Sequence, residues 1–574
     1  MKAQPIYQTR KISNMKDMIF QSVNLFGTRN AFLIKGEDGQ YYGKTYTELK
    51  DEIDALGTAL IDLGLKDKKI AILSQNSAQW CTSYLTITGG VGVVVPLDRE
   101  LPFHEIENLI SRAGVSAVIF SSSHREDMTK LSKTSKVIEY YIDIDLGENE
   151  AINNFLSYKG LIQKGKNLIA SGEKSYLDAY IDENEMIALI FTSGTTDLAK
   201  GVMLSSKNIV TDVMAVCSML SIDENDSALS ILPLHHTYEC TAGFLVMMYN
   251  GCCLSFNEGL KYIVKNLQET KPTILMLVPL ILENMHKKII KQASKSFFSK
   301  IKLNVALEIS NFLFLFLKID IRKKLFKQIL NVFGGRVRLV ISGAAAINPD
   351  VSNDLCAMGI RIVQGYGLTE CAPIVAVNND RGYRSDSAGK ALAGVDIWVE
   401  DVGDDGIGEF VISGDNVMLG YFENPIATKK VLRNGCLYTG DLGYIDDEGY
   451  IYITGRKKNV IVTKNGKNIF PEEVEAYLAK CPYVKESLVW GRYVEESGET
   501  EVNAQIVIDV DEIKERLSLN IISHDEIYKL IHSEIKEINK QMPLYKRVKD
   551  FTIREEEFAK TTTKKIKRYA ENIG

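Results

Sequence analysis

The sequence is poor in cysteine, and no two cysteines have the C-x-x-C spacing. Nine of the 574 residues are cysteines, and the close pair Cys252 and Cys253 is adjacent in sequence within an apolar stretch. The spacing therefore gives no sign of a disulfide framework. We expect reduced thiols, most of them buried.

Long apolar runs are also missing. No segment approaches the roughly 20 apolar residues that a membrane-spanning helix needs. The residues after Met1 lead into charged sequence without the apolar core of a signal peptide. We therefore expect a cytoplasmic protein, and a peripheral contact with the inner face of the membrane stays open.

The chain has no excess of positive charge. Its net charge is -6 and its pI is about 5.9, with Lys and Arg interspersed among Asp and Glu. Such a chain has no general basic field for nucleic acid, so nucleic acid is not an expected partner. With 574 residues and 45% hydrophobic content, the sequence predicts a globular protein of two or more domains.

The P-loop of nucleoside triphosphatases is absent as well. The nearest match, Gly39 to Thr45, has its first glycine one position late for the G-x-x-x-x-G-K-[ST] pattern. A different phosphate-binding loop follows the buried strand predicted at 187–191. It runs from Thr192 to Gly201.

This loop combines the groups that hold phosphates. Gly194 permits a close backbone approach to an anion, and Lys200 supplies positive charge. Four hydroxyl side chains can donate to phosphate oxygens: Thr192, Ser193, Thr195 and Thr196. The alternative is a polar turn between two strands, because loops rich in Ser, Thr and Gly are common.

Short β-rich runs alternate with helical patterns in the first part of the chain. This alternation predicts parallel α/β layers, with ligands at the carboxyl ends of the strands. After Ile397, glycine-rich alternating segments such as 408–412 and 449–453 predict antiparallel strands in a small barrel-like subdomain, at about 397–455. We place the domain boundary after Gly455, which gives domains 1–455 and 456–574. The second is a smaller α+β unit, in which Pro471 opens a helix.

One segment, at about 287–330, is both basic and apolar. It contains eleven Lys and Arg residues against Glu308 and Asp320, together with the apolar run 312–317. Such a segment can lie on an anionic membrane surface. The alternative is a helical excursion whose apolar side packs on the body while its lysines face water.

Further motifs follow the hydroxyl-rich loop in a fixed order: Gln364-Gly365-Tyr366-Gly367-Leu368-Thr369-Glu370, Tyr438-Thr439-Gly440-Asp441, Gly455-Arg456-Lys457-Lys458 and Thr562-Thr563-Lys564-Lys565-Ile566-Lys567-Arg568. Together with the sequence of residues 70–98, these motifs resemble those of the adenylate-forming (AMP-binding) superfamily of acyl-CoA synthetases, peptide-synthetase adenylation domains and luciferases. The segment at 287–330 makes the chain look like the long-chain fatty acid CoA ligases. The resemblance covers almost the whole chain.

The resemblance implies an α/β fold with a large amino-terminal domain, the barrel-like subdomain and a smaller, mobile α+β carboxy-terminal domain. It also implies an ATP-dependent ligase that makes an acyl-adenylate and transfers the acyl group to coenzyme A. Lys565 matches the catalytic lysine that bridges the carboxylate and the α-phosphate. Glu370 and Thr192 are the expected Mg²⁺ ligands.

Other residues match positions that bind the nucleotide or coenzyme A. Asp441 would accept the ribose hydroxyls, with Arg456 at the same nucleotide. Lys458 would be the hinge of the small domain, and Gly466 would help form the pantetheine passage. The remaining matches, around the adenine and phosphates, are Gly343, Ala344, Ala345, Gln364, Gly365, Tyr366, Gly367 and Thr369. The small residues among them can equally be packing necessities.

The segment 233–239 resembles the family's acyl entrance. His236 matches the usual histidine, as a gate or as a group that orients the carboxylate, and residues 240–244 can line an apolar tunnel. Amino-acid-activating relatives usually carry an Asp here, after Phe. No Phe-Asp pair occurs in this segment, which indicates a plain carboxylic acid, with a fatty acid as the expected substrate.

The sequence departs from the family at three positions. Asp197 replaces a usual glycine, Ala199 replaces a usual proline, and Lys564 replaces the glycine before the catalytic lysine. A carboxylate beside the triphosphate costs affinity unless it points outward or meets a cation, and two adjacent lysines leave open which one reaches the phosphate. An acyl-carrier-protein acceptor, another carboxylic acid, and a non-catalytic adenylate-binding or membrane-adaptor protein remain alternatives.

Overall fold

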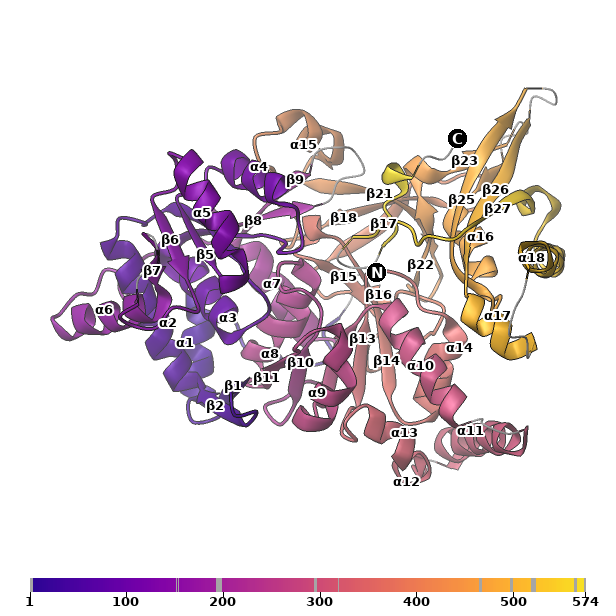
Figure 1. The fold of residues 1–574 in the computed structure, drawn as a ribbon, viewed down its shortest axis with the longest axis horizontal. Coiled ribbons are helices and arrows are strands. Elements are labelled where there is room, and N and C mark those ends of the chain that lie inside the picture. Colours follow the sequence, from indigo (N-terminus) through magenta and orange to yellow (C-terminus); the bar gives the residue numbers. More distant parts are fainter. Residues whose placement is uncertain are drawn as a thin grey trace. The chain divides into compact units, whose positions relative to one another are not determined.

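The computed structural model describes residues 4–150, 152, 154–192, 199–293, 297–317, 319–463, 467–495, 499–517, 523–561 and 565–571. It forms two compact units, the first made of Met1–Ile397 and Ile412–Leu437 and the second of Trp398–Val411 and Tyr438–Gly574. Figure 1 shows the α/β character of the first unit and the sheets of the second. The functional domain boundary at 455 stays a prediction.

A nine-stranded sheet runs through the first unit in the order β16-β15-β14-β13-β12-β10-β11-β1-β2. Its centre is parallel, with Val340 of β13 opposite Leu275 of β12 and Ile362 of β14. The strands are β1 (Asn30–Lys35), β2 (Tyr41–Thr45), β10 (Ser227–Ser230), β11 (Cys253–Phe256), β12 (Ile274–Leu277), β13 (Leu339–Ser342), β14 (Arg361–Gly367), β15 (Ile374–Val377) and β16 (Lys390–Ala391).

An eight-stranded sheet has the order β19-β9-β8-β4-β3-β5-β6-β7. Its strands are β3 (Lys68–Leu73), β4 (Gly92–Pro96), β5 (Ala117–Phe120), β6 (Tyr140–Asp143), β7 (Leu156–Ser157), β8 (Met186–Thr192), β9 (Lys200–Ser205) and β19 (Gly420–Tyr421). β3 is parallel to β4 and β5, whereas β8 and β9 are antiparallel. The predicted phosphate loop therefore connects two neighbouring strands at one edge of this sheet.

The helices of the first unit are α1 (Met15–Phe26), α2 (Tyr46–Asp62), α3 (Ala78–Thr86), α4 (Phe103–Ala113), α5 (Arg125–Thr134), α6 (Tyr158–Ala170), α7 (Ser206–Cys217), α8 (Val246–Tyr249), α9 (Ile263–Thr270), α10 (Pro279–Ala293), α11 (Phe297–Leu317), α12 (Arg322–Leu325), α13 (Lys327–Val332), α14 (Pro349–Ala357) and α15 (Pro425–Val431). Local chemistry fixes several of their starts. Thr45 and Glu48 form a capping box at α2, because each side chain bonds to the backbone of the other.

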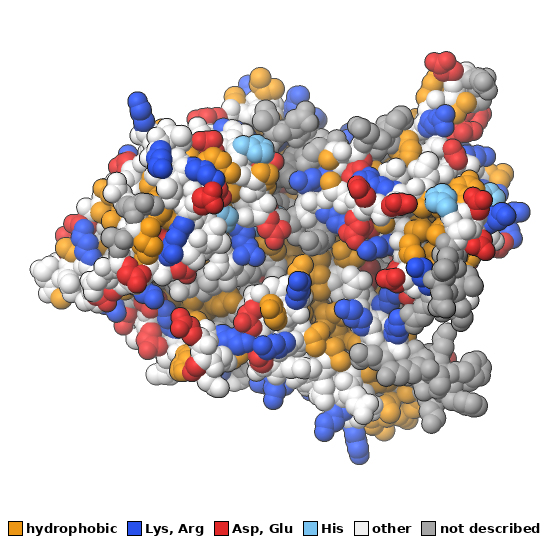
Figure 2. All heavy atoms as spheres, viewed as in Figure 1, with side chains coloured by type: hydrophobic (Ala, Val, Ile, Leu, Met, Phe, Trp, Pro, Cys, Tyr) orange, Lys and Arg blue, Asp and Glu red, His pale blue; other side chains and the backbone are white. Residues whose placement is uncertain are grey.

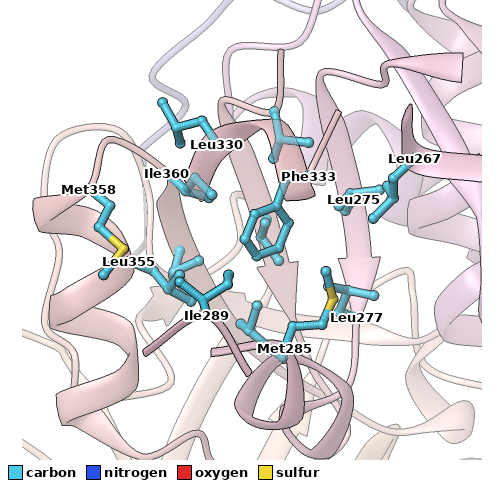
Figure 3. Packing of buried hydrophobic residues seen from close by; sticks show 14 of the residues in the cluster. Leu267, Leu275, Leu277, Met285, Ile289, Leu330, Phe333, Leu355, Met358 and Ile360 are labelled. Atoms are coloured by element: carbon cyan, nitrogen blue, oxygen red, sulfur yellow. The ribbon is translucent and has the colours of Figure 1, made fainter. Parts of the chain in front are cut away.

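A hydrophobic cluster lies where α10, α13 and α14 cover the nine-stranded sheet (Figure 3). Phe333 is fully buried, and in this view its ring lies among the side chains of Leu277, Met285 and Ile289. Full burial of one such side chain contributes roughly 1.5–3 kcal/mol. This cluster holds the helices that precede and follow α11.

The second unit is built mainly on antiparallel strands. A five-stranded sheet has the order β17-β18-β21-β20, with β22 on β21, and its strand β20 comes from the first unit. A three-stranded sheet has the order β25-β26-β27. The strands are β17 (Asp396–Glu400), β18 (Gly408–Ser413), β20 (Leu432–Arg433), β21 (Cys436–Ile445), β22 (Ile451–Arg456), β23 (Ile461–Val462), β24 (Asn468–Ile469), β25 (Val484–Val494), β26 (Glu499–Ile508) and β27 (Val548–Arg554).

Its helices are α16 (Pro471–Leu478), α17 (Val510–Leu517) and α18 (His524–Lys540). Pro471 is the first residue of α16, as the sequence predicts. The α/β fold class is confirmed. All nine cysteines are free and six of them are buried, which also agrees with the prediction.

Within the described ranges, no helix combines the length and the apolar character that crossing a bilayer requires.

Candidate active site

The two ends of the predicted phosphate loop lie side by side. Thr192 is the last residue of β8 and Lys200 the first of β9, and the two are paired across the strands. The Thr192 hydroxyl donates to the Lys200 carbonyl oxygen over 3.4 Å. Ser193, Gly194, Thr195, Thr196 and the departure Asp197 lie outside the described residues. The structure thus places the ends of the loop at the edge of the sheet.

Glu370 is joined to Lys200 through a tyrosine. The Tyr421 hydroxyl donates to Glu370 Oε1 over 2.8 Å, and the Lys200 ammonium lies 4.9 Å from the centre of the Tyr421 ring. Tyr421 reaches this position because β19 pairs with β9, with Tyr421 opposite Val202. Sequence reasoning missed Tyr421, since its position depends on pairing between strands more than 200 residues apart in sequence. Gly420, which has a φ of 140°, is a weak local signal of a special backbone position.

The surroundings of Glu370 suit a hard cation. Glu370 and its neighbour Thr369 lie in a short 3₁₀ turn, and the Thr369 hydroxyl is 3.3 Å from that of Thr237. Carboxylate and hydroxyl oxygens are typical Mg²⁺ ligands, and this ion usually takes its other ligands from phosphate and water. Among the described residues, no group of three or more His, Cys, Asp or Glu side chains could hold a metal. The assignment of Glu370 and Thr192 as Mg²⁺ ligands stays a prediction.

The predicted adenine segments follow β13 and end β14. Gly343 packs against a ring, since a Cβ there would come within 3.0 Å of Tyr238. Ala344 has a φ of 73°, the left-handed region that L residues seldom adopt. Such backbone strain is concentrated at functional sites. Ala345 continues this turn, which is joined to β14 through Gln364.

Both polar atoms of the Gln364 side chain form hydrogen bonds with main-chain groups. Its Nε2 donates to the Ser385 carbonyl over 2.6 Å, and its Oε1 accepts from the Ile347 amide over 3.3 Å. Tyr366 is 7% exposed. A Cβ on Gly367 would lie 2.1 Å from the Pro373 carbonyl oxygen, so packing requires glycine there. Gly365 is less constrained, because the nearest atom to a Cβ is 3.2 Å away.

The rings of the adjacent His235 and His236 lie close together, with their centres 4.2 Å apart and their planes tilted by 46°. His235, not His236, lines a small cavity of about 10 Å³ together with Tyr84, Thr237, Cys240 and other residues of the first unit. Burial lowers the pKa of His235 to about 3, and the charge of Arg99 acts in the same direction. His235 is therefore neutral at physiological pH. The cavity has room for about one water molecule.

A fully buried carboxyl group lies directly beside this cavity's lining. Glu239 Oε1 accepts from the Ser230 hydroxyl over 2.7 Å, while Oε2 has no hydrogen-bond partner in the described part of the chain. Burial raises the pKa of Glu239 to about 8, although the bond from Ser230 opposes the change. The group is therefore mostly protonated at neutral pH.

In the second unit, Asp441 and Arg456 face each other across β21 and β22. Arg456 Nε lies 2.7 Å from Asp441 Oδ1. Asp441 is buried to 5% exposure, whereas Arg456 is half-exposed. The backbone amide of Asp441 donates to the Thr439 hydroxyl over 3.0 Å, which fixes the turn.

Two predicted lysines lie near this pair. The pKa of Lys565 is lowered, first by desolvation and then by the charge of Arg456, while the charge of Asp441 opposes the change. Desolvation, with the charges of Arg456 and Arg568, lowers the pKa of Lys458 to about 8. Lys564 and Gly466 lie outside the described residues. The fold thus brings Lys565 into electrostatic range of Asp441 and Arg456, from more than 100 residues away.

Comparison with known proteins agrees with these motifs. The family model "AMP-binding enzyme" matches residues 20–422, and "AMP-binding enzyme C-terminal domain" matches 458–571. Long chain acyl-CoA synthetase 4 of Arabidopsis thaliana is 29% identical, over 81% of this chain and 73% of its own. Long-chain-fatty-acid–CoA ligase 5 of Rattus norvegicus is 30% identical, over 78% of this chain and 69% of its own.

Among solved structures, the anthranilate CoA ligase AuaEII in complex with anthranoyl-AMP matches with a TM-score of 0.76 and 21% identity, over 99% of this chain and 97% of its own. At this identity the match shows the fold alone. The fold and the two family models define an adenylate-forming type of enzyme. The chain belongs to the AMP-binding enzyme family.

Proposed function

We propose that this protein is an ATP-dependent, AMP-forming ligase that activates a long-chain fatty acid as acyl-adenylate and transfers the acyl group to coenzyme A. The observation that carries the proposal is the match to long-chain acyl-CoA synthetases over about four fifths of the chain. The absence of a Phe-Asp pair in the acyl-entrance segment supports a plain acid over an amino acid.

Each group has a proposed role in the first half-reaction. The hydroxyl-rich loop and Lys200 bind the triphosphate, while Glu370 and Thr192 hold Mg²⁺, whose charge would neutralise phosphate oxygens. Asp441 accepts the ribose hydroxyls beside Arg456. Lys565 stabilises the charge that develops as the acid carboxylate attacks the α-phosphorus. His236 gates the acyl entrance or orients the carboxylate.

The second half-reaction needs a different arrangement. We propose that Lys458 is the hinge, and that the loop with Gly466 forms the pantetheine passage once the adenylate exists. The acceptor thiol belongs to coenzyme A, since the long-chain relatives are named as CoA synthetases and ligases. A carrier-protein thiol presents the same pantetheine arm. Product formation with free CoA, compared with carrier protein, separates the two acceptors.

A pyrophosphate-release screen tests the acid. It should include straight-chain acids from about two to about twenty carbons and aromatic acids. Each buried methylene contributes about 0.8 kcal/mol, so four added carbons raise preference on the order of 200-fold where a tunnel buries them. We expect release to rise with chain length. Preference for an aromatic acid would instead favour the chemistry named for the anthranilate ligase, and no release with any acid would favour a non-catalytic protein.

A further inference from the structure

Four large apolar side chains are exposed on α11, together with the polar side chains of Glu308 and Asn311. Val305, Ile309, Phe312 and Phe316 are 46%, 49%, 55% and 73% exposed. Their spacing of four, three and four residues places them along one face of the helix. We call these four residues the apolar stripe. A surface helix normally carries its polar residues on that side.

The opposite side of α11 is anchored to the first unit. Ala306 and Leu307 pack against the hydrophobic cluster of Figure 3, and α11 contacts α10 and α14. The buried Ser310 hydroxyl donates to the Ala357 carbonyl over 2.9 Å. These contacts fix the orientation of α11 on the first unit. The apolar stripe therefore faces away from the hydrophobic cluster while another side of the helix packs against it.

The stripe continues into a basic surface. Leu317, Ile319 and Leu325 follow it and are 54%, 50% and 45% exposed. Lys323, Lys324 and Lys327 are exposed among them. Orange hydrophobic atoms lie beside blue Lys and Arg atoms at the lower margin of Figure 2, near the places of α12 and α13 in Figure 1.

Charge in this part of the chain is one-sided. Residues 287–330 contain eleven Lys and Arg against two acidic residues, although the whole chain has a net charge of -6. Asp320 is paired with Arg322, with Nη2 and Oδ2 2.7 Å apart, so one of the two acidic residues is already neutralised locally. Lys323, Lys324 and Lys327 therefore carry positive charge toward solvent.

We propose that the apolar stripe, with the basic residues of α12 and α13, docks on an anionic lipid surface. Exposed aromatic and aliphatic side chains favour the acyl boundary of a bilayer, and flanking lysines favour anionic headgroups. Two copies that met through this same patch would bring Lys323, Lys324 and Lys327 of each chain together, and these like charges repel, whereas anionic headgroups attract them. The proposal does not depend on the ligase activity.

Co-sedimentation with vesicles tests the docking. The full chain should bind vesicles that contain anionic phosphatidylglycerol much better than pure phosphatidylcholine vesicles. Binding should weaken as salt rises from about 0.1 to about 1 M, because the Debye length falls from about 10 to about 3 Å. Lys323→Gln with Lys324→Gln should weaken binding about 30-fold, at about 1 kcal/mol for each lysine. The matched control is Lys429→Gln with Lys430→Gln, an exposed lysine pair on α15.

The apolar contribution has its own control. Phe312→Ser with Phe316→Ser should weaken binding at least about tenfold, while Phe20→Ser should leave it unchanged. Phe20 lies on α1 and is 55% exposed, the same as Phe312. Melting curves should confirm that each variant is folded.

A tryptophan probe locates the contact. The fluorescence of the tryptophan introduced by Phe316→Trp should shift to shorter wavelength on anionic vesicles, and brominated acyl chains should quench it. The tryptophan introduced by Phe20→Trp should show neither change. Equal quenching of both probes, or vesicle binding that survives both α11–α12 variants, would overturn the proposal. So would a stripe variant that leaves vesicle binding unchanged but converts a dimer to a monomer in light scattering, since a second copy would then be the partner.

Discussion

A single hydroxyl joins the predicted metal ligand to the strand that follows the phosphate loop. Tyr421 donates to Glu370 and places its ring beside the Lys200 ammonium, so it orients both groups without itself being expected to touch substrate. We regard it as a positioning residue. The same reasoning applies to Gln364, whose side chain ties β14 to the segment after β13 through Ile347 and to the segment after β15 through Ser385.

Tyr421→Phe keeps the ring beside Lys200 and removes the bond to Glu370. A hydrogen bond to a charged group contributes about 1.5–3 kcal/mol, so adenylation should fall at least about tenfold. Because Glu370 would be less well oriented, half-maximal activity should also need more Mg²⁺. Pyrophosphate release measured against Mg²⁺ concentration checks both effects. Tyr42→Phe is the control, since it removes an exposed tyrosine–carboxylate bond to Asp38; an equal change in both variants would contradict the role.

Lys565→Ala should abolish adenylation and spare thioester formation from pre-made acyl-AMP. The lysine is expected to act on the α-phosphate in the first half-reaction, where loss of one such group typically costs about 100-fold to 1,000-fold. Pyrophosphate release and thioester formation are measured separately. Lys567→Ala, in the same segment, is the control. Near-normal pyrophosphate release by Lys565→Ala would contradict the assignment of Lys565. Lys564 would then be the candidate for this role, and Lys564→Ala tests it.

Glu239 should make stability fall with rising pH. Burial raises its pKa from 4.5 to about 8, so between these values the unfolded chain ionises while the folded chain keeps the proton. The contribution is complete below about pH 4.5 and is lost toward pH 8, at no more than about 1.4 kcal/mol per pH unit. Melting temperatures of wild type and Glu239→Gln, measured across this range, check it. A difference between them that does not change with pH would contradict the assignment.

At the scale of elements, the hinge prediction concerns backbone angles rather than charge. Lys458 lies in a short 3₁₀ turn after β22. Lys458→Pro fixes φ, so it should impair one half-reaction and spare the other. Lys458→Ala removes the ammonium but keeps backbone freedom, and both half-reactions should survive in it. Assays of each half-reaction with both variants make the comparison. Equal loss of the two half-reactions in folded Lys458→Pro would count against a hinge.

The sequence predicted elements whose signals are local. The strand before the hydroxyl-rich loop, the helix that starts at Pro471 and the antiparallel segments after Ile397 all follow from periodicity and capping residues. The family resemblance also predicts that Asp441 and Arg456 bind one nucleotide; the structure pairs the two side chains, and their role at a nucleotide stays a prediction. The position of Tyr421 depends on strand pairing, and the lining role of His235 depends on which of two adjacent rings turns inward. Apart from the glycine before Tyr421, neither leaves a pattern in the sequence.

The outward face of α11 is a second feature that the sequence alone did not predict. Sequence composition marked the segment as basic and apolar but could not tell which side would pack. The expected alternative placed lysines in water and the apolar side on the body. The structure agrees with this alternative in packing Ala306 and Leu307 against the body and in exposing Lys323 and Lys324, but it also exposes Phe312 and Phe316. A helix with apolar residues on several sides has no unique inward face until its neighbours are placed.

At the scale of the whole molecule, the two units have separate hydrophobic cores. The second unit's core includes Ile531, and the first unit's cluster in Figure 3 includes Leu355; both side chains are fully buried. We expect two calorimetric transitions. Ile531→Ala should reduce the free energy of unfolding of the second unit by about 2–5 kcal/mol, and Leu355→Ala that of the first unit by a similar amount. Each variant should therefore shift a different transition to lower temperature. If either variant shifts both transitions equally, the units unfold as one.

The water-sized cavity beside His235 has a consequence for selection among acids. A space of about 10 Å³ cannot hold a hydrocarbon chain, so the proposed function requires the lining side chains to move apart before an acid binds there. Apparent affinity is then the intrinsic affinity multiplied by the fraction of molecules in which they have moved apart. Every acid bears the same opening cost, but only a long chain buries enough methylenes, at about 0.8 kcal/mol each, to offset it. We therefore expect short acids to be rejected by a threshold rather than by a clash.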